Sequence, residues 1–228
     1  MEYTGLIGGI YKVSLWISRF AAINILWLLF NLPIIYFVFT LLSVDSPNDL
    51  MTIGMTTVII IPFIFFPATT AMFGIIRKWI LGHEINMLSS FWKYYKENYV
   101  KSLLGGILIV LIWILLIEDY YFYLTTNSSE FFSYFFSILT LLLFVSTLHF
   151  FSLTVHMNIT LLQIFKNAIY FTFRSPLLTL QLVISTGIVI VLSFSMMTFL
   201  IPFFLGSLLA YFSFSSFLRS LVIIKEKI

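Results

Sequence analysis

The chain has no cysteine, and only 9% of its 228 residues are charged. Without cysteine, disulfides, thiolate nucleophiles and cysteine-based metal sites are excluded. A soluble domain of ordinary composition has about 25% charged residues, so this chain is not one. Hydrophobic residues make up 61% of it, including 27 Phe. Lipid is therefore the expected environment for most of its surface.

Side chains that could catalyse a reaction or bind a metal are also scarce. The three histidines, His83, His149 and His156, form no His-Glu-x-x-His motif and have no acidic partner at ligand spacing. We therefore expect no metal, no other cofactor and no enzymatic activity. The net charge is +3, but the basic residues flank apolar stretches and form no continuous patch. This pattern argues against nucleic acid as a partner.

Stretches without charge predict six membrane-spanning helices. One charge at mid-bilayer costs about 2.5–3.5 kcal/mol, and about 20 residues cross a hydrocarbon core of about 30 Å. The charge-free stretch from Ser175 to Leu218 is about twice that length, so it is expected to fold back near Pro202. The prediction is an all-α integral membrane protein, a single membrane domain over 1–228. Its expected spans are about 20–43, 52–76, 102–123, 131–154, 176–196 and 203–222.

The signs of the charges predict the orientation of these spans. Cytoplasmic loops of membrane proteins keep Lys and Arg, and all twelve such residues fall on one side of the six-span arrangement. We therefore expect a multi-pass protein of a bacterial cell membrane with both termini in the cytoplasm. The basic residues are Lys12, Arg19, Arg77, Lys78, Lys93, Lys96, Lys101, Lys166, Arg174, Arg219, Lys225 and Lys227. The opposite side receives Asp45, Asp49, Glu118, Asp119 and Glu130.

Two cytoplasmic loops, about 85–100 and 158–173, are predicted to form amphipathic helices in the membrane interface. Both carry apolar residues at helical spacing, with polar residues on the other face. Lys93 precedes Lys101 by eight residues, as Lys166 precedes Arg174. This likeness is explained by a duplicated sequence unit, or equally by two loops that each have to lie in the membrane interface. A further amphipathic helix over 3–19 is expected to lead into the first span, or to be an extension of it.

Several residues within the spans are candidates for packing or function. His149 is an ionisable side chain inside a span, which raises proton or substrate handling beside a structural role. Pro33, Pro62 and Pro67 predict helix kinks, and broken helices build binding sites in transporters. The intramembrane polar candidates are His149, Gln181, Asn24 and Asn31. The candidates for helix packing or partner contact are Pro67, Ala68, Ala71, Gly74, Gly206, Ala210 and Ser213.

One segment resembles a known family. The run Phe66–Phe73, then Arg77–Trp79 and Gly82, is similar to the signature of the YesL-like family of bacterial membrane proteins. The pattern there is Gly-Pro-Ala-x-x-Ala-Leu followed by a basic turn like Arg-Lys-Trp, and Phe66 replaces the usual Gly. Phe91–Trp92 and Asn98–Ser102 also resemble that family. Its members tend to be encoded beside carbohydrate ABC importers, so the resemblance implies a role near oligosaccharide uptake, without site residues to carry over.

Two functions are consistent with these features. The first is a non-enzymatic accessory subunit that docks on the permease subunits of a carbohydrate ABC importer. The alternative is a small transporter or channel, which predicts a water-lined cavity that touches an intramembrane polar residue. Seven of the twelve basic residues belong to the two cytoplasmic loops and their flanks, so that face is a candidate for docking. Its candidates are Arg77, Lys78, Trp79, Trp92, Lys93, Lys101, Lys166 and Arg174.

Overall fold

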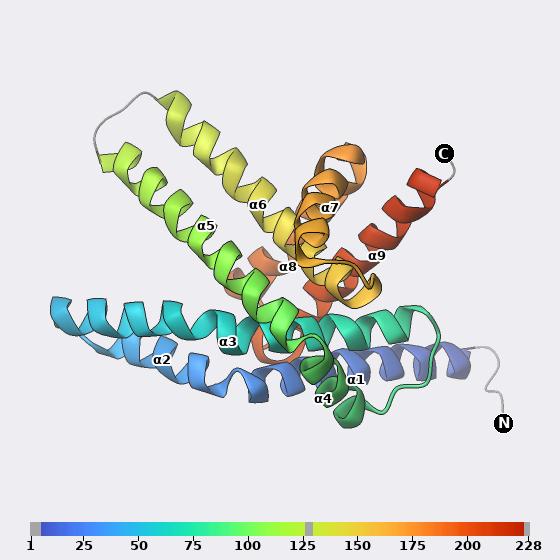
Figure 1. Ribbon diagram of the computed structural model, residues 1–228. Coiled ribbons are helices and arrows are strands. Elements are labelled where there is room, and N and C mark those ends of the chain that lie inside the picture. Colours follow the sequence, from blue (N-terminus) through green and yellow to red (C-terminus); the bar gives the residue numbers. More distant parts are fainter. Residues whose placement is uncertain (1–5, 126–129, 226–228) are drawn as a thin grey trace.

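The computed structural model describes residues 6–125 and 130–225, and within these ranges all regular structure is helical (Figure 1). Six helices are long and apolar enough to cross a membrane, and the shorter α2, α4 and α7 join them. The predicted all-α membrane protein with six spans is confirmed. The elements are α1 (Leu6–Phe30), α2 (Leu32–Ser43), α3 (Pro47–Ile80), α4 (Met87–Glu97), α5 (Tyr99–Thr125), α6 (Glu130–His156), α7 (Leu161–Arg174), α8 (Pro176–Ser195), the π-helical turn η1 (Ile201–Leu205) and α9 (Gly206–Lys225).

Helix α3 is the centre of the molecule. Its most apolar stretch is 67% buried, the highest share among the six candidate spans. It packs against α1, α2, α4, α5, α6 and α9. At 34 residues it is about 51 Å long at 1.5 Å per residue, and it continues through Pro62 and Pro67. The other helices are therefore arranged around one long apolar axis.

The first span differs from its expected boundaries. Residues 3–5 lie outside the described part, but from Leu6 the helix runs without interruption through residue 20 to Phe30. The break falls instead at Asn31, because Pro33 lies in the first turn of α2 and cannot donate a backbone hydrogen bond to the preceding turn. The expected lead-in helix over 3–19 and the first part of span 20–43 are thus one helix. Residues 32–43 form a separate apolar helix.

Helices α4 and α7 form in the two loops for which amphipathic helices were predicted. The side chain of Asn86 accepts from the backbone N–H of Ser89 at 3.4 Å at the start of α4. At the start of α7, Gln163 Oε1 accepts from the N–H of Thr160 at 3.0 Å. Both helices pack on a long helix that precedes them, α4 on α3 and α7 on α6. Their location in a membrane interface stays a prediction.

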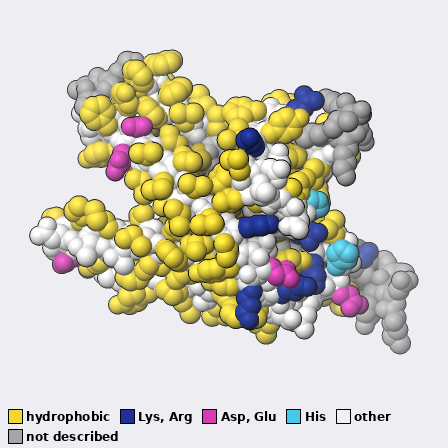
Figure 2. Space-filling model, viewed as in Figure 1, with side chains coloured by type: hydrophobic (Ala, Val, Ile, Leu, Met, Phe, Trp, Pro, Cys, Tyr) yellow, Lys and Arg dark blue, Asp and Glu magenta, His cyan; other side chains and the backbone are white. Residues whose placement is uncertain are grey.

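The charge asymmetry is visible on the folded chain. All the Lys and Arg side chains that can be seen in Figure 2 lie in its right-hand half, around α4, α7 and the end of α9. Acidic side chains alone mark the two arms at the left. The loop of residues 44–46, between α2 and α3, therefore lies at the opposite end of the molecule from α4.

This arrangement gives a direct test of orientation in the naturally cysteine-free chain. In intact cells, Asp45→Cys is expected to react with a membrane-impermeant maleimide, because residue 45 lies in the exposed acidic loop. Ser89→Cys, on an exposed position of α4, is expected to react only after permeabilisation. Labelling of residue 89 but not 45 in intact cells would reverse the orientation.

Candidate functional site

An apolar cleft lies between α3 and the α5–α6 pair. These two arms meet near the middle of the molecule and diverge toward the left of Figure 1, and Figure 2 shows a notch between them. The cleft has a volume of about 420 Å³. It is lined by Trp27, Val58, Ile61, Phe65, Phe66, Thr69, Met72, Phe73, Val110, Trp113, Ile114, Ile117, Phe144, Thr147, Leu148, Phe151, Leu205, Gly206 and Leu209.

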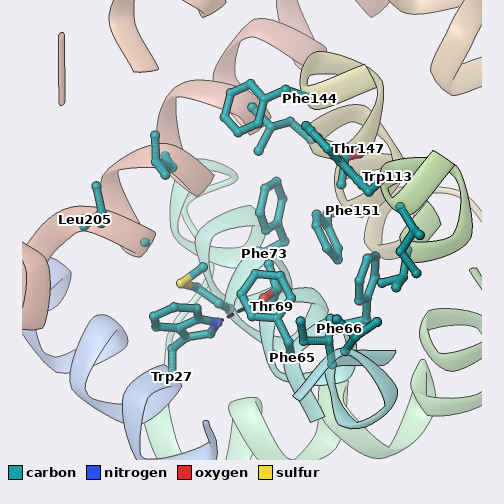
Figure 3. Close-up of a pocket in the computed structure, with 18 of the residues that line it drawn as sticks. Trp27, Phe65, Phe66, Thr69, Phe73, Trp113, Phe144, Thr147, Phe151 and Leu205 are labelled. Carbon is teal, nitrogen blue, oxygen red and sulfur yellow. Dashed lines mark hydrogen bonds between the residues drawn. The ribbon is translucent and has the colours of Figure 1, made fainter. Parts of the chain in front are cut away.

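Three of the four side chains in the cleft lining that can form hydrogen bonds, Trp27, Thr69 and Thr147, bind one another or the backbone, and the fourth is the indole of Trp113. Trp27 Nε1 donates to Thr69 Oγ1 at 3.0 Å, the dashed line of Figure 3. The hydroxyl of Thr147 donates to the carbonyl of Leu143, one turn earlier in α6, at 2.8 Å. An occupant therefore gains little from polar groups of its own, and an unpaired polar group would lose its hydrogen bonds to water. The cleft is suited to an apolar occupant.

Two adjacent glycines bring the arms together at the closed end of the cleft. A Cβ on Gly105 would collide with the ring of Phe150 on α6, and a Cβ on Gly106 would lie 2.6 Å from the ring of Phe66 on α3. In the same region Ser102 donates to Thr70 at 2.8 Å, and both side chains are fully buried. Beyond this point α5 carries large side chains, and the helices diverge. The glycine pair and the hydroxyl pair thus set the vertex from which the cleft opens.

Comparison with known proteins supports a family assignment. A family model described as "Protein of unknown function, DUF624" matches residues 20–120. The uncharacterised protein YesL of Bacillus subtilis (strain 168) is 26% identical over 203 residues, which cover 89% of this chain and 84% of YesL. The resemblance to the YesL-like family is confirmed. YteU of the same organism, also uncharacterised, is 33% identical over 113 residues, 49% of this chain and 40% of YteU. No solved structure matches.

The part matched by the family model contains two walls of the cleft. Residues 20–120 include Trp27, the cleft face of α3 and the α5 wall. The Phe66–Phe73 run lies in the centre of α3, and four of its eight residues line the cleft. Phe66, where the family pattern has Gly, is helical and packs over Gly106. The large residue on α3 thus faces a small one on α5.

The predicted small-residue faces are used inside the chain. Ala68, Ala71, Ala210 and Ser213 are fully buried, and Pro67 is buried with them. The remaining two candidates are glycines at close helix contacts. A Cβ on Gly74 would collide with the ring of Tyr94 on α4, and one on Gly206 would lie 3.0 Å from Asn24 Oδ1. These residues pack against other helices of the same chain, and Gly206 also lines the apolar cleft.

Asn24 joins α1 to the turn before α9. Its amide nitrogen donates to the carbonyls of Ile201 at 3.1 Å and Pro202 at 2.7 Å. Its oxygen accepts from the backbone N–H of Ser207 at 3.0 Å. The side chain therefore satisfies backbone groups at the π-helical turn around Pro202, where the chain folds back. This is a structural role, which engages the amide nitrogen with two carbonyls and the amide oxygen with one N–H.

The other intramembrane polar candidates lie apart from one another. Asn31 donates to the carbonyl of Trp27 at 2.7 Å and closes the end of α1, while its Oδ1 has no hydrogen-bond partner among the described residues. His149 is 1% exposed and lies beside Phe171 and Phe217, and its Nδ1 has no partner in the same part of the chain. Gln181 is exposed on α8 and lines a small crevice. The structure brings none of the four into the apolar cleft.

Three of the cytoplasmic candidates are engaged within the fold. Arg77 Nε lies 3.4 Å from Nδ1 of His156 on α6, and Lys78 Nζ lies 3.4 Å from the hydroxyl of Ser90 on α4. Trp79 is 9% exposed and packs in a cluster with Trp16, Phe20 and Tyr211. These contacts hold the basic end of α3 against its neighbours.

The remaining cytoplasmic candidates are more accessible. Trp92, Lys93, Lys166 and Arg174 are exposed, whereas Lys101 is half-buried and donates to the Asn158 side chain at 3.3 Å. Lys93 also forms an i,i+4 ion pair with Glu97 at 3.7 Å, a surface contact worth about 0.3–0.5 kcal/mol. Partial burial, with a contribution from Tyr99, raises the pKa of Tyr95 above its ordinary value, so this phenol is neutral at physiological pH. The accessible residues are distributed over α4 and α7 and form no closed site.

Proposed function

We propose that this protein is a non-catalytic accessory subunit of a carbohydrate ABC importer, and that the apolar cleft receives one transmembrane helix of the importer's permease. The observation that carries the proposal is the lining of the cleft, which is apolar apart from two tryptophans and two threonines, and of these Trp27, Thr69 and Thr147 are hydrogen-bonded within the chain. The cleft lies among helices apolar enough to span a membrane. The importer as partner rests on the family resemblance.

The character of the lining favours a protein occupant. Aromatic residues are enriched in the centres of protein interfaces, where rigid rings give contact area at low entropy cost. Seven of the residues that line the cleft are Trp or Phe. In a bilayer, helices associate through close van der Waals packing, which such a preformed wall provides. A helix of about 10–12 Å diameter would enter at the wide end and contact α3, α5 and α6 together.

Site-specific photo-crosslinking in native membranes tests this proposal. A photoreactive phenylalanine analogue at Val58, on the cleft wall, is expected to form an adduct with a permease subunit identified by mass spectrometry. The same analogue at Ile59, which is 65% exposed and outside the cleft lining, is the matched control. Adducts to lipid alone at both positions would contradict a protein occupant.

Filling the cleft is expected to release the partner. Ile61→Trp adds a large ring to the cleft wall, so recovery of the permease with the protein from solubilised membranes should fall about tenfold or more, equivalent to about 1.4 kcal/mol. Ile59→Trp places the same ring on an exposed face and should leave recovery unchanged. Equal recovery with both variants would exclude the cleft as the docking surface.

The alternative function, a small transporter, requires a different structural feature. It needs a hydrated path that reaches an intramembrane polar group, and of the four candidates Gln181 lines a described crevice, of about 150 Å³. Purified protein in liposomes should then move a solute by itself, and Gln181→Ala should abolish that movement. Such a result would replace the accessory role.

A further inference from the structure

A small polar crevice lies between α8 and α9. Its volume is about 150 Å³, and its lining differs in kind from that of the apolar cleft. Gln181 and Ser185 are one turn apart on α8, and Ser215 and Arg219 are one turn apart on α9, so each pair lies on one face of its helix. The full lining is Gln181, Leu182, Ser185, Tyr211, Phe212, Ser215, Ser216 and Arg219.

The crevice presents unused hydrogen-bond donors. Ser185 and Ser216 donate to carbonyls of α8, at 3.1 and 3.3 Å. Arg219 and Gln181 form no hydrogen bond or ion pair with any residue that the structure describes. A guanidinium offers five N–H donors and an amide two. None of the eight lining residues is acidic, so the site combines one positive charge with several donors, the chemistry that recognises a phosphate group.

The location of the crevice indicates where such a phosphate comes from. Gln181 is near the start of α8 and Arg219 near the end of α9, at the end of the bundle where the basic residues gather (Figures 1 and 2). Beyond Gln181 along α8, toward the opposite end of the span, Ile184 and Ile188 are each 53% exposed. A phospholipid would place its phosphate at Arg219 and its acyl chains along these apolar side chains.

We propose that the α8–α9 crevice binds the phosphate of an anionic phospholipid headgroup, with Arg219 as its charged anchor and Gln181 and Ser215 as hydrogen-bond donors. Basic pockets between transmembrane helices on the cytoplasmic side are suited to such headgroups. The site is separate from the apolar cleft, and the two have no lining residue in common. It would hold the α8–α9 pair to the inner leaflet, whether or not a partner helix occupies the cleft.

Native mass spectrometry of the purified chain tests this site. Titration with phosphatidylglycerol is expected to show one preferred bound lipid, and phosphatidylcholine at the same concentration should bind at least tenfold more weakly. Arg219→Gln should lower the affinity for phosphatidylglycerol about tenfold, as expected for the loss of one charge-assisted phosphate contact. Gln181→Leu, which keeps the net charge, should lower it about threefold. Arg174→Gln removes one exposed arginine outside the crevice and should leave affinity within twofold.

Several outcomes would overturn the proposal. Equal losses for Arg219→Gln and Arg174→Gln would show diffuse attraction to the basic end. Displacement of phosphatidylglycerol by millimolar inorganic phosphate would show a site for the free anion. If Arg219→Gln does not yield folded protein, an unchanged affinity in both Gln181→Leu and Ser215→Ala would overturn it as well.

Discussion

Asn24→Leu is expected to lower the free energy of unfolding by about 2–3 kcal/mol, since three hydrogen bonds of about 0.6–1 kcal/mol each are lost. The substitution leaves the carbonyls of Ile201 and Pro202 and the N–H of Ser207 without their partner in an apolar interior. It also places a branched side chain beside Gly206. The contact there is already close, because a Cβ built on Gly206 would lie 3.0 Å from the Asn24 oxygen. Titration with sodium dodecyl sulfate in mixed micelles, followed by tryptophan fluorescence, measures the change.

Asn31 supplies a matched control on the same segment. It is also a buried asparagine, but it donates one hydrogen bond, to Trp27, and its oxygen has no partner. Asn31→Leu removes that bond together with an unsatisfied buried acceptor, so the two effects offset each other and the net change should stay within about 1 kcal/mol. Equal destabilisation by the two substitutions would show that Asn24 does not hold the π-helical turn.

The spans could be predicted because a charge in the bilayer is costly, so gaps between charged residues mark the spanning helices. The fold-back near Pro202 followed from the length of one uncharged stretch. The break at Asn31 could not be placed in the same way. Pro33 lies in an apolar run that continues on both sides, and Pro62 and Pro67, in similar runs, do not end α3.

The apolar cleft was missed for a related reason. Helices α3, α5 and α6 are apolar on all sides, so hydrophobic periodicity does not distinguish a face that packs from one that meets lipid. The lining residues also come from six separate elements. The one available signal was Gly105-Gly106 near the start of a Leu- and Ile-rich span, since adjacent small residues indicate close helix approach.

These glycines lead to the second prediction of large effect. Gly105→Ala is expected to destabilise the protein by about 1–3 kcal/mol, as is typical of overpacking in a close-packed interior. The added methyl would collide with the ring of Phe150, which is 1% exposed and itself packs against Phe151 and Phe165. Because the ring is buried among these neighbours, moving it away from the methyl would disturb their packing. Equilibrium unfolding in mixed micelles measures the loss.

Gly187→Ala is the opposite case and the control. Gly187 lies inside α8, and a Cβ there would meet nothing within 4 Å. Alanine is favoured over glycine inside a helix by about 0.5–1 kcal/mol, so this substitution should leave stability unchanged or raise it. A gain in stability at both positions would mean that helix propensity, and not the α5–α6 contact, governs Gly105. If the contact does govern it, Gly105→Ala must also shift α5 relative to α6. Crosslinking from Val58 in the cleft should then fall, whereas Gly187→Ala should leave it unchanged.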